Sequence, residues 1–141
     1  KAADIAVSDI STPNLDAIRA FNPAIVCHTS NLDCIKGADF IVLAVKPWLV
    51  ELIAHEIADA VNFNKQVIVS IAAGVTLEKL QSLFPDKDGS VATLFRVIPN
   101  TAIDVQESFS CIASWNASDQ QEAFMVSLFN EMGKAMLVPE T

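Results

Sequence analysis

The stretch FIVLAV at residues 40–45 is apolar throughout and ends at Lys46-Pro47. A strand with one face in water alternates apolar and polar residues, whereas a continuous apolar run of this length is typical of a strand buried on both faces. Such strands form parallel sheets that helices cover on both sides. Apolar residues at helical spacing follow directly and predict one of these helices (Leu49, Leu52, Ile53 and Ile57).

The same strand and helix unit recurs on both sides of this stretch. Upstream, strands are predicted at Asp4–Val7 and Ala24–Cys27, with a helix through Leu15, Ile18 and Phe21 and a brief one capped by Ser30 or Asn31. Downstream, strands are predicted at Val67–Ile71, Val91–Val97, Phe109–Ala113 and Ala135–Val138, with helices from Thr76 and from the capping box Ser118-x-x-Gln121 to about Met132. This alternation predicts one α/β domain, a Rossmann-type, doubly wound fold with a mainly parallel sheet.

Composition excludes several classes of function. The net charge of -8, without a run of Lys or Arg, disfavours nucleic acid as a partner. The apolar runs are far shorter than the roughly 20 residues of a membrane span, and no leader is recognisable, so we expect a soluble, cytoplasmic protein without a membrane partner. Cys27, Cys34 and Cys111 have no C-x-x-C spacing, which suggests neither a disulfide framework nor a metal site. The two tryptophans, Trp48 and Trp115, are expected to be packing residues.

Ligands of an open parallel sheet bind outside the carboxyl ends of its strands. In this sequence those ends are Ser8-Asp9, Val45-Lys46-Pro47, Ile71–Gly74 and Ile98–Thr101. Most of them carry small residues, which let the backbone lie against a flat ring or a ribose without an intervening side chain. The pattern predicts a dinucleotide site.

The glycine-rich turn G-x-G-x-x-G of such domains is absent, and the chain has only four glycines. That turn follows the first strand of the fold. Asp4–Asp9 reads instead as the second strand, and the sequence starts at Lys1 rather than at Met. We therefore expect the first βα unit to lie upstream of this sequence.

Three motifs, in this order and at these separations, resemble the pyrroline-5-carboxylate reductases: A-V-K-P at 44–47, S-I-A-A-G-V-T at 70–76 and R-V-I-P-N-T at 96–101. The resemblance extends from about Ile5 to Val138. It implies that residues 1–141 are an incomplete N-terminal domain that binds NADPH or NADH. It also implies a C-terminal helical domain, absent from this chain, that forms a homo-oligomer and contributes to the substrate site.

The resemblance assigns roles to individual residues. Ser8 and Asp9 resemble the loop that meets the adenosine ribose or its 2′-phosphate, and Asn31 resembles an Asn that contacts the adenosine portion. The other cofactor-contacting positions belong to the two turns and to the end of the third motif (Ala44, Val45, Lys46, Pro47, Ala72, Ala73, Gly74, Asn100 and Thr101). The usual continuation N-T-P is N-T-A here, so the substrate edge differs in detail.

The implied reaction is hydride transfer to the C=N carbon of 1-pyrroline-5-carboxylate, which gives proline, the last step of its biosynthesis. No residue of this chain is assigned as catalytic. The choice between NADH and NADPH stays open, because Asp9 ends the second strand, where a carboxylate favours NAD, while the family often uses NADP. The alternatives are a non-catalytic nucleotide-binding module and a related β-hydroxyacid-type dehydrogenase.

Overall fold

Strands and helices alternate along the whole chain in the computed structural model, which describes residues 1–100 and 107–140. The first part contains β1 (Ala6–Ser8), α1 (Thr12–Phe21), β2 (Val26–His28) and α2 (Asn31–Cys34). The second part contains β3 (Phe40–Leu43), α3 (Val50–Ile57), β4 (Val67–Ser70), α4 (Leu77–Leu83), β5 (Thr93–Ile98), β6 (Ser108–Trp115), α5 (Asp119–Asn130) and β7 (Gly133–Leu137). Two short 3₁₀ helices, Ala2–Asp4 and Pro47–Leu49, precede β1 and α3.

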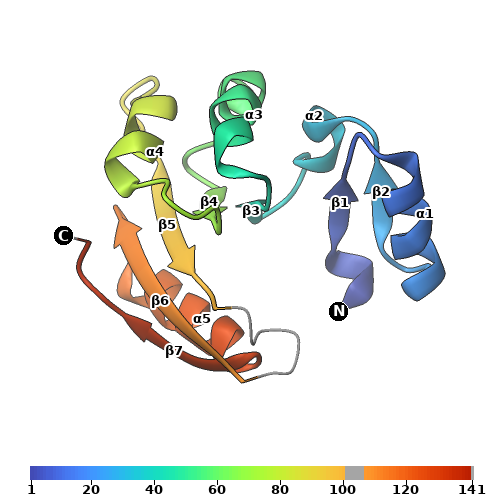
Figure 1. Cartoon of the computed structure of the whole chain (residues 1–141). Helices are drawn as coiled ribbons and strands as arrows, with labels where there is room; N and C mark the ends of the chain where they lie inside the picture. The colour runs from blue at the N-terminus through green and yellow to red at the C-terminus, as the bar shows by residue number, and fades with distance from the viewer. Residues whose placement is uncertain (101–106, 141) are drawn as a thin grey trace.

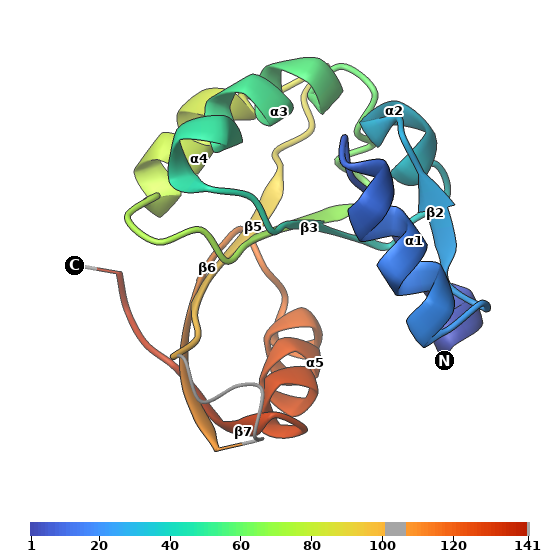
Figure 2. The same ribbon diagram turned by 45° about the vertical axis from the view of Figure 1, so that its right-hand side comes forward.

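The central sheet has the order β3-β4-β5-β6-β7, and only the β5–β6 pair is antiparallel. Helices α3 and α4 cover one face of this sheet and α5 covers the other (Figures 1 and 2). The predicted fold class, α/β with a mainly parallel sheet covered on both faces, is confirmed.

The sheet is divided, which the sequence pattern did not show. Strands β1 and β2 form a separate parallel pair, and β1 lies between β3 and β2 in Figure 1. The spatial order is therefore β2, β1, an interval, β3, β4, β5. A Rossmann sheet has the strand order 3-2-1-4-5-6, which places its first strand in that interval. Among the described residues, no strand pairs with the facing edges of β1 and β3.

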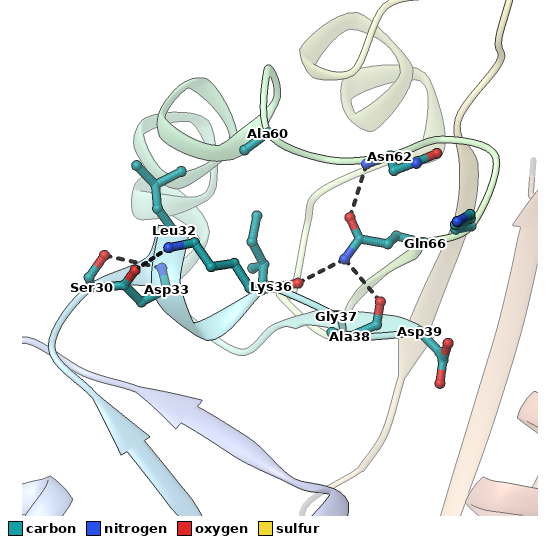
Figure 3. A pocket seen from close by; sticks show the side chains of 12 residues that line it. Ser30, Leu32, Asp33, Lys36, Gly37, Ala38, Asp39, Ala60, Asn62 and Gln66 are labelled. Carbon is teal, nitrogen blue, oxygen red and sulfur yellow. Dashed lines mark hydrogen bonds and ion pairs between the residues drawn. The ribbon is translucent and has the colours of Figure 1, made fainter.

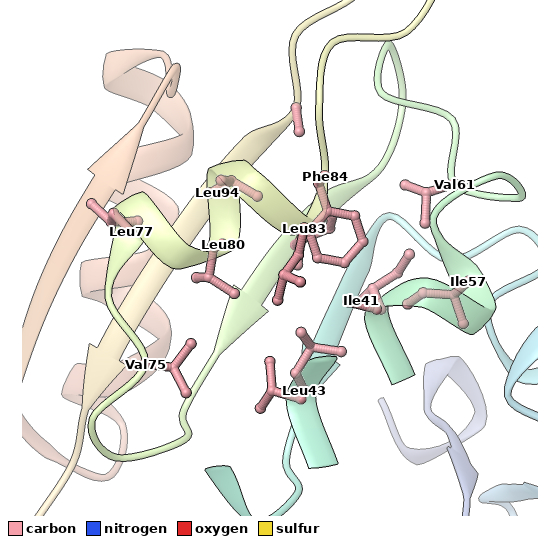
Figure 4. Close-up of a cluster of buried hydrophobic side chains, with 14 of the residues drawn as sticks. Ile41, Leu43, Ile57, Val61, Val75, Leu77, Leu80, Leu83, Phe84 and Leu94 are labelled. Atoms are coloured by element: carbon pink, nitrogen blue, oxygen red, sulfur yellow. The ribbon is translucent and has the colours of Figure 1, made fainter. Parts of the chain in front are cut away.

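The larger core fills the space between the sheet and helices α3 and α4 (Figure 4). Helix α4 contributes leucines at three-residue spacing, namely Leu77, Leu80 and Leu83. The sheet contributes the alternate residues Ile41 and Leu43 of β3, together with Ile68 of β4 and Leu94 of β5. Burying each such side chain contributes about 1.5 to 3 kcal/mol. A second core beneath α5 contains Phe95, Met125 and Phe129.

Local capping signals were predicted correctly. Thr76 precedes α4 and its side chain accepts a hydrogen bond from the Lys79 backbone N–H. Ser118 and Gln121 form both bonds of the predicted capping box at the start of α5. Ser30, rather than Asn31, caps α2. These signals involve neighbouring residues only, so no tertiary contact is needed to specify them.

The prediction that β3 is buried on both faces was wrong. The strand ends at Leu43, and the Val42 side chain is 53% exposed. Phe40, on the same face, stacks on Phe124 of α5 with ring centroids 4.9 Å apart. Val42 lies one strand repeat farther on, beside the unpaired edge of β3. Val42 is therefore exposed because of where β3 lies in the sheet, and the sequence of the strand does not show this.

Other expectations were also corrected. Trp48 is 75% exposed and Trp115 46% exposed, so neither packs in the interior. On α3, Leu52 faces outward, and the buried positions are Val50, Ala54 and Ile57. The strand boundaries differ from the predicted ones by at most two residues, as in β1, which starts at Ala6 because the residues before it form a 3₁₀ turn. Element ends are where side-chain patterns carry the least information.

Candidate functional site

Three of the predicted segments leave the central sheet side by side. Leu43, Ser70 and Arg96 are register partners across β3, β4 and β5, and these three strands are parallel. The loops that begin at Ala44 and Ile71 therefore leave the sheet beside the C-terminal part of β5. That strand ends at Ile98 and leads to Asn100. Thr101, the last predicted site residue, and Ala102 lie outside the described residues. The structure thus brings the predicted turns to one edge.

The residues of these turns differ in how exposed they are to solvent. The first turn is accessible at Ala44, Lys46 and Pro47, whereas Val45 is partly buried. In the second turn Ala73 and Gly74 are exposed. Ala72 is 5% exposed, packs in the larger core, and donates its N–H to Ser70 Oγ at 3.3 Å. Ala72 therefore supports the turn from inside, and a ligand at this edge would meet Ala73 and Gly74.

Gly74 has the φ of +76° that favours glycine. It reverses the chain between β4 and α4 while presenting no side chain. A turn of this kind lets a flat group approach the backbone closely, which is the role that the sequence pattern assigns to it. Lys46, at the neighbouring turn, is exposed and forms no ion pair within the described residues.

The residues predicted for the adenosine side lie together at the end of β1. Ser8 Oγ donates to Asn31 Oδ1 at 2.7 Å, and Asn31 Nδ2 donates to Glu56 Oε2 at 2.9 Å. This chain of hydrogen bonds joins β1, α2 and α3. It therefore connects the two-stranded pair to a helix that covers the central sheet. Sequence reasoning missed Glu56, because an exposed Glu on a helix carries no local signal.

Replacing Asn31 with Ala is expected to lower the free energy of unfolding of the 141-residue chain by about 1 kcal/mol, the net value of such hydrogen bonds. Urea denaturation measures it. The control is Gln120→Ala on the exposed face of α5, which should stay within about 0.5 kcal/mol of wild type. Equal stability of wild type and Asn31→Ala would mean that these bonds do not hold the two parts together.

Asp9 is engaged with the start of α1. Its carboxylate accepts from the Ser11 backbone N–H at 2.8 Å and from Asn14 Nδ2 at 3.0 Å. The Ser11 N–H, and after it the Asn14 amide, lower the pKa of the Asp9 carboxyl. The side chain is thus an anion at neutral pH, next to Ser8 at the end of β1. That anion would repel a phosphate placed beside it.

One cavity lies away from these turns. A hollow of about 680 Å³ is lined by residues of α2 and of the loops before β3 and β4, including Asp39 and Gln66 (Figure 3). These positions are at the amino ends of the strands. The buried Gln66 amide is used structurally, since its Nε2 donates to the Ile35 and Ala38 carbonyls and its Oε1 accepts from the Asn62 N–H. Ligands of this fold bind at the opposite edge, so the hollow is not the candidate site.

Within residues 1–100 and 107–140, no group of three or more His, Cys, Asp and Glu side chains is placed to hold a metal ion. In the same part of the chain, no helix has the length and apolarity needed to cross a membrane.

An open, mainly parallel sheet with small-residue turns at the carboxyl ends of its strands is the architecture of the Rossmann class. Residues 2–74, just over half of the chain, match the family model described as NADP oxidoreductase, coenzyme F420-dependent, and the chain belongs to this family.

Two bacterial relatives named pyrroline-5-carboxylate reductase match nearly the whole chain. The chain is 30% identical to the pyrroline-5-carboxylate reductase of Pasteurella multocida over 142 aligned positions, covering 99% of this chain and 50% of the relative. It is 32% identical to that of Haemophilus influenzae over 132 positions, covering 92% and 46%. The chain therefore spans about half the length of these relatives.

Solved structures agree on the fold. The pyrroline-5-carboxylate reductase of Coxiella burnetii superposes with a TM-score of 0.85 at 23% identity, over 96% of this chain and 49% of that one. The Plasmodium falciparum pyrroline carboxylate reductase, solved with NADP bound, gives a TM-score of 0.82 at 21% identity, over 99% and 48%. A prephenate dehydrogenase from Aquifex aeolicus gives 0.72 at 11% identity over 96% and 52%, so the fold is shared beyond one activity.

Proposed function

We propose that the full gene product reduces 1-pyrroline-5-carboxylate to L-proline with NADPH or NADH, and that this chain supplies most of its dinucleotide-binding domain. One observation carries the proposal. The three motifs that resemble the reductases emerge at the same sheet edge, with their strands in register. The names of the relatives support the same activity.

The residues present fit a nicotinamide dinucleotide. Ala73 and Gly74 offer exposed backbone without bulky side chains, and Lys46 offers an exposed positive charge in a chain of net charge -8. Ser8, Asp9 and Asn31 would hold the adenosine ribose. Ala44, Val45 and Pro47 would line the dinucleotide with Lys46, Ala72 would support its turn, and Asn100 and Thr101 would border the nicotinamide and the substrate.

The bound cofactor would supply the hydride. The chain's own contribution is to hold the reacting groups together and to exclude water. No side chain among the described residues is assigned as a proton donor. The proton would come from water, from the iminium form of the substrate, or from a part of the gene product outside this chain.

The domain arrangement is part of the proposal. The interval between β1 and β3 has the place of the first strand in a Rossmann sheet, so we assign it to an upstream βα unit that carries the glycine-rich turn. A helical domain would contribute to the substrate site and form a homo-oligomer. A cytoplasmic location fits the same reading.

A steady-state assay of the full gene product tests the activity. NADPH or NADH should be oxidised when pyrroline-5-carboxylate is added and not in its absence. Binding of the cofactor without turnover would instead identify a nucleotide-binding module. Turnover with a β-hydroxyacid and NAD⁺ or NADP⁺, but not with the imine, would identify the related dehydrogenase class.

A further inference from the structure

One ion pair is shielded from water, and it joins distant parts of the chain. Arg96 Nη1 of β5 lies 2.5 Å from Glu140 Oε1, and both side chains are 18% exposed. In every other ion pair of the described residues, both partners are at least 47% exposed. Exposed pairs contribute little, whereas breaking a shielded pair leaves an uncompensated charge.

The second oxygen of the same carboxylate reaches the start of α4. Glu140 Oε2 accepts from the Leu77 backbone N–H at 2.8 Å. Leu77 is the first residue of that helix, so its N–H has no partner within the helix. Just after β7, the Val138 N–H donates to the Ile112 carbonyl of β6. This bond directs the following residues past β6 toward α4 (Figure 1).

These contacts anchor the C-terminal end of the turn between β4 and α4, which under the proposed function contacts the cofactor. The turn between β4 and α4 starts at Ser70, which is fully buried and accepts from the Ala72 N–H. It ends at Leu77, where Glu140 binds. Between the two anchors lie the exposed residues Ala73 and Gly74. Moving the second anchor would therefore move the surface that the cofactor meets.

We propose that Arg96 and Glu140 are positioning residues for the nicotinamide end of the cofactor, acting through Leu77 on the Ala73-Gly74 turn. The proposal rests on the proposed function. One detail argues against a purely stabilising role. Arg96 Nε is buried without a hydrogen-bond partner in the described part of the chain, and an unpaired buried donor costs stability.

The test compares two ligands on the full gene product: the intact cofactor, and the matching ADP-ribose fragment that lacks nicotinamide. In Glu140→Gln and in Arg96→Met, the Kd of the cofactor should rise about fivefold, as for the loss of one typical hydrogen bond. The Kd of the fragment should stay within about twofold, because Ser8, Asp9 and Asn31 lie on other elements. Arg96→Lys, which keeps the charge, should recover part of the loss.

Glu51→Gln is the matched control, since it removes an exposed ion pair that also involves α4, between Glu51 of α3 and Lys79 of α4. It should leave both dissociation constants unchanged. If Glu140→Gln weakened the binding of both ligands equally, or lowered the melting temperature without changing cofactor binding, the positioning role would be overturned. The proposed function would not be affected by that result. Failure of the wild-type gene product to bind either ligand would overturn the proposed function, and the positioning role with it.

Discussion

The 141-residue chain on its own is expected to oxidise NADPH or NADH with pyrroline-5-carboxylate at least about a thousandfold more slowly than the full gene product. Holding two reactants in place can contribute a factor of this size or more. Under the proposed function, the isolated chain lacks the phosphate-binding turn and the other half of the substrate site. Parallel steady-state assays at equal protein concentration measure the difference.

A folding control separates loss of parts from loss of structure. The isolated chain should retain helical circular dichroism and a cooperative urea transition, because α3, α4 and α5 pack on cores made from its own residues. Comparable turnover by the two proteins would contradict the idea that essential parts lie outside this chain. An unfolded fragment would contradict the packing of these helices on the two cores.

Replacing Asp9 with Ser is expected to raise the NADPH to NADH ratio of kcat/KM by at least about tenfold, which corresponds to roughly 1.4 kcal/mol. The carboxylate accepts hydrogen bonds well from ribose hydroxyls, but it repels a 2′-phosphate. Its lowered pKa keeps it charged throughout the neutral range. Paired cofactor titrations on wild type and mutant, at fixed pH and salt, give the ratio.

Two controls separate charge from local structure, because Asp9 also holds the start of α1. Asp9→Asn removes the charge at nearly constant shape and should change the ratio in the same direction. Asn14→Ala removes one hydrogen bond of the Asp9 carboxylate but keeps its charge, so the ratio should stay near wild type. A ratio within about twofold of wild type in Asp9→Ser, or a shift toward NADH, would show that Asp9 does not face the ribose; Ser8 or Ser11 would then be the better candidate.

The sequence predicted best where local pattern and burial agree. Val67–Ser70 is buried at every position, as its apolar run indicated. The capping residues Thr76 and Ser118 act within one helical turn, so their role is readable without tertiary structure. Val42 shows the opposite case. Its apolar strand predicted burial, but burial also needs a neighbouring layer, and none covers it among the described residues.

The candidate site likewise has features that the sequence predicted and features that it did not. Motifs located the turns at Ala44–Pro47 and Ala72–Gly74, and register brings these turns to one edge. The long-range pairs around the site were not predictable, since Asn31 meets Glu56 across 25 residues and Arg96 meets Glu140 across 44. Such pairs carry no spacing signal, because only the folded chain brings them together.

The fate of the hydride distinguishes reduction of the imine from cofactor binding alone. The full gene product would be given pyrroline-5-carboxylate and NADPH or NADH carrying deuterium at the transferable position of nicotinamide C4, and the product would be examined by mass spectrometry. We expect proline with one deuterium on the ring carbon that was the imine carbon. Proline without deuterium, or no proline despite cofactor binding, would contradict the proposed function.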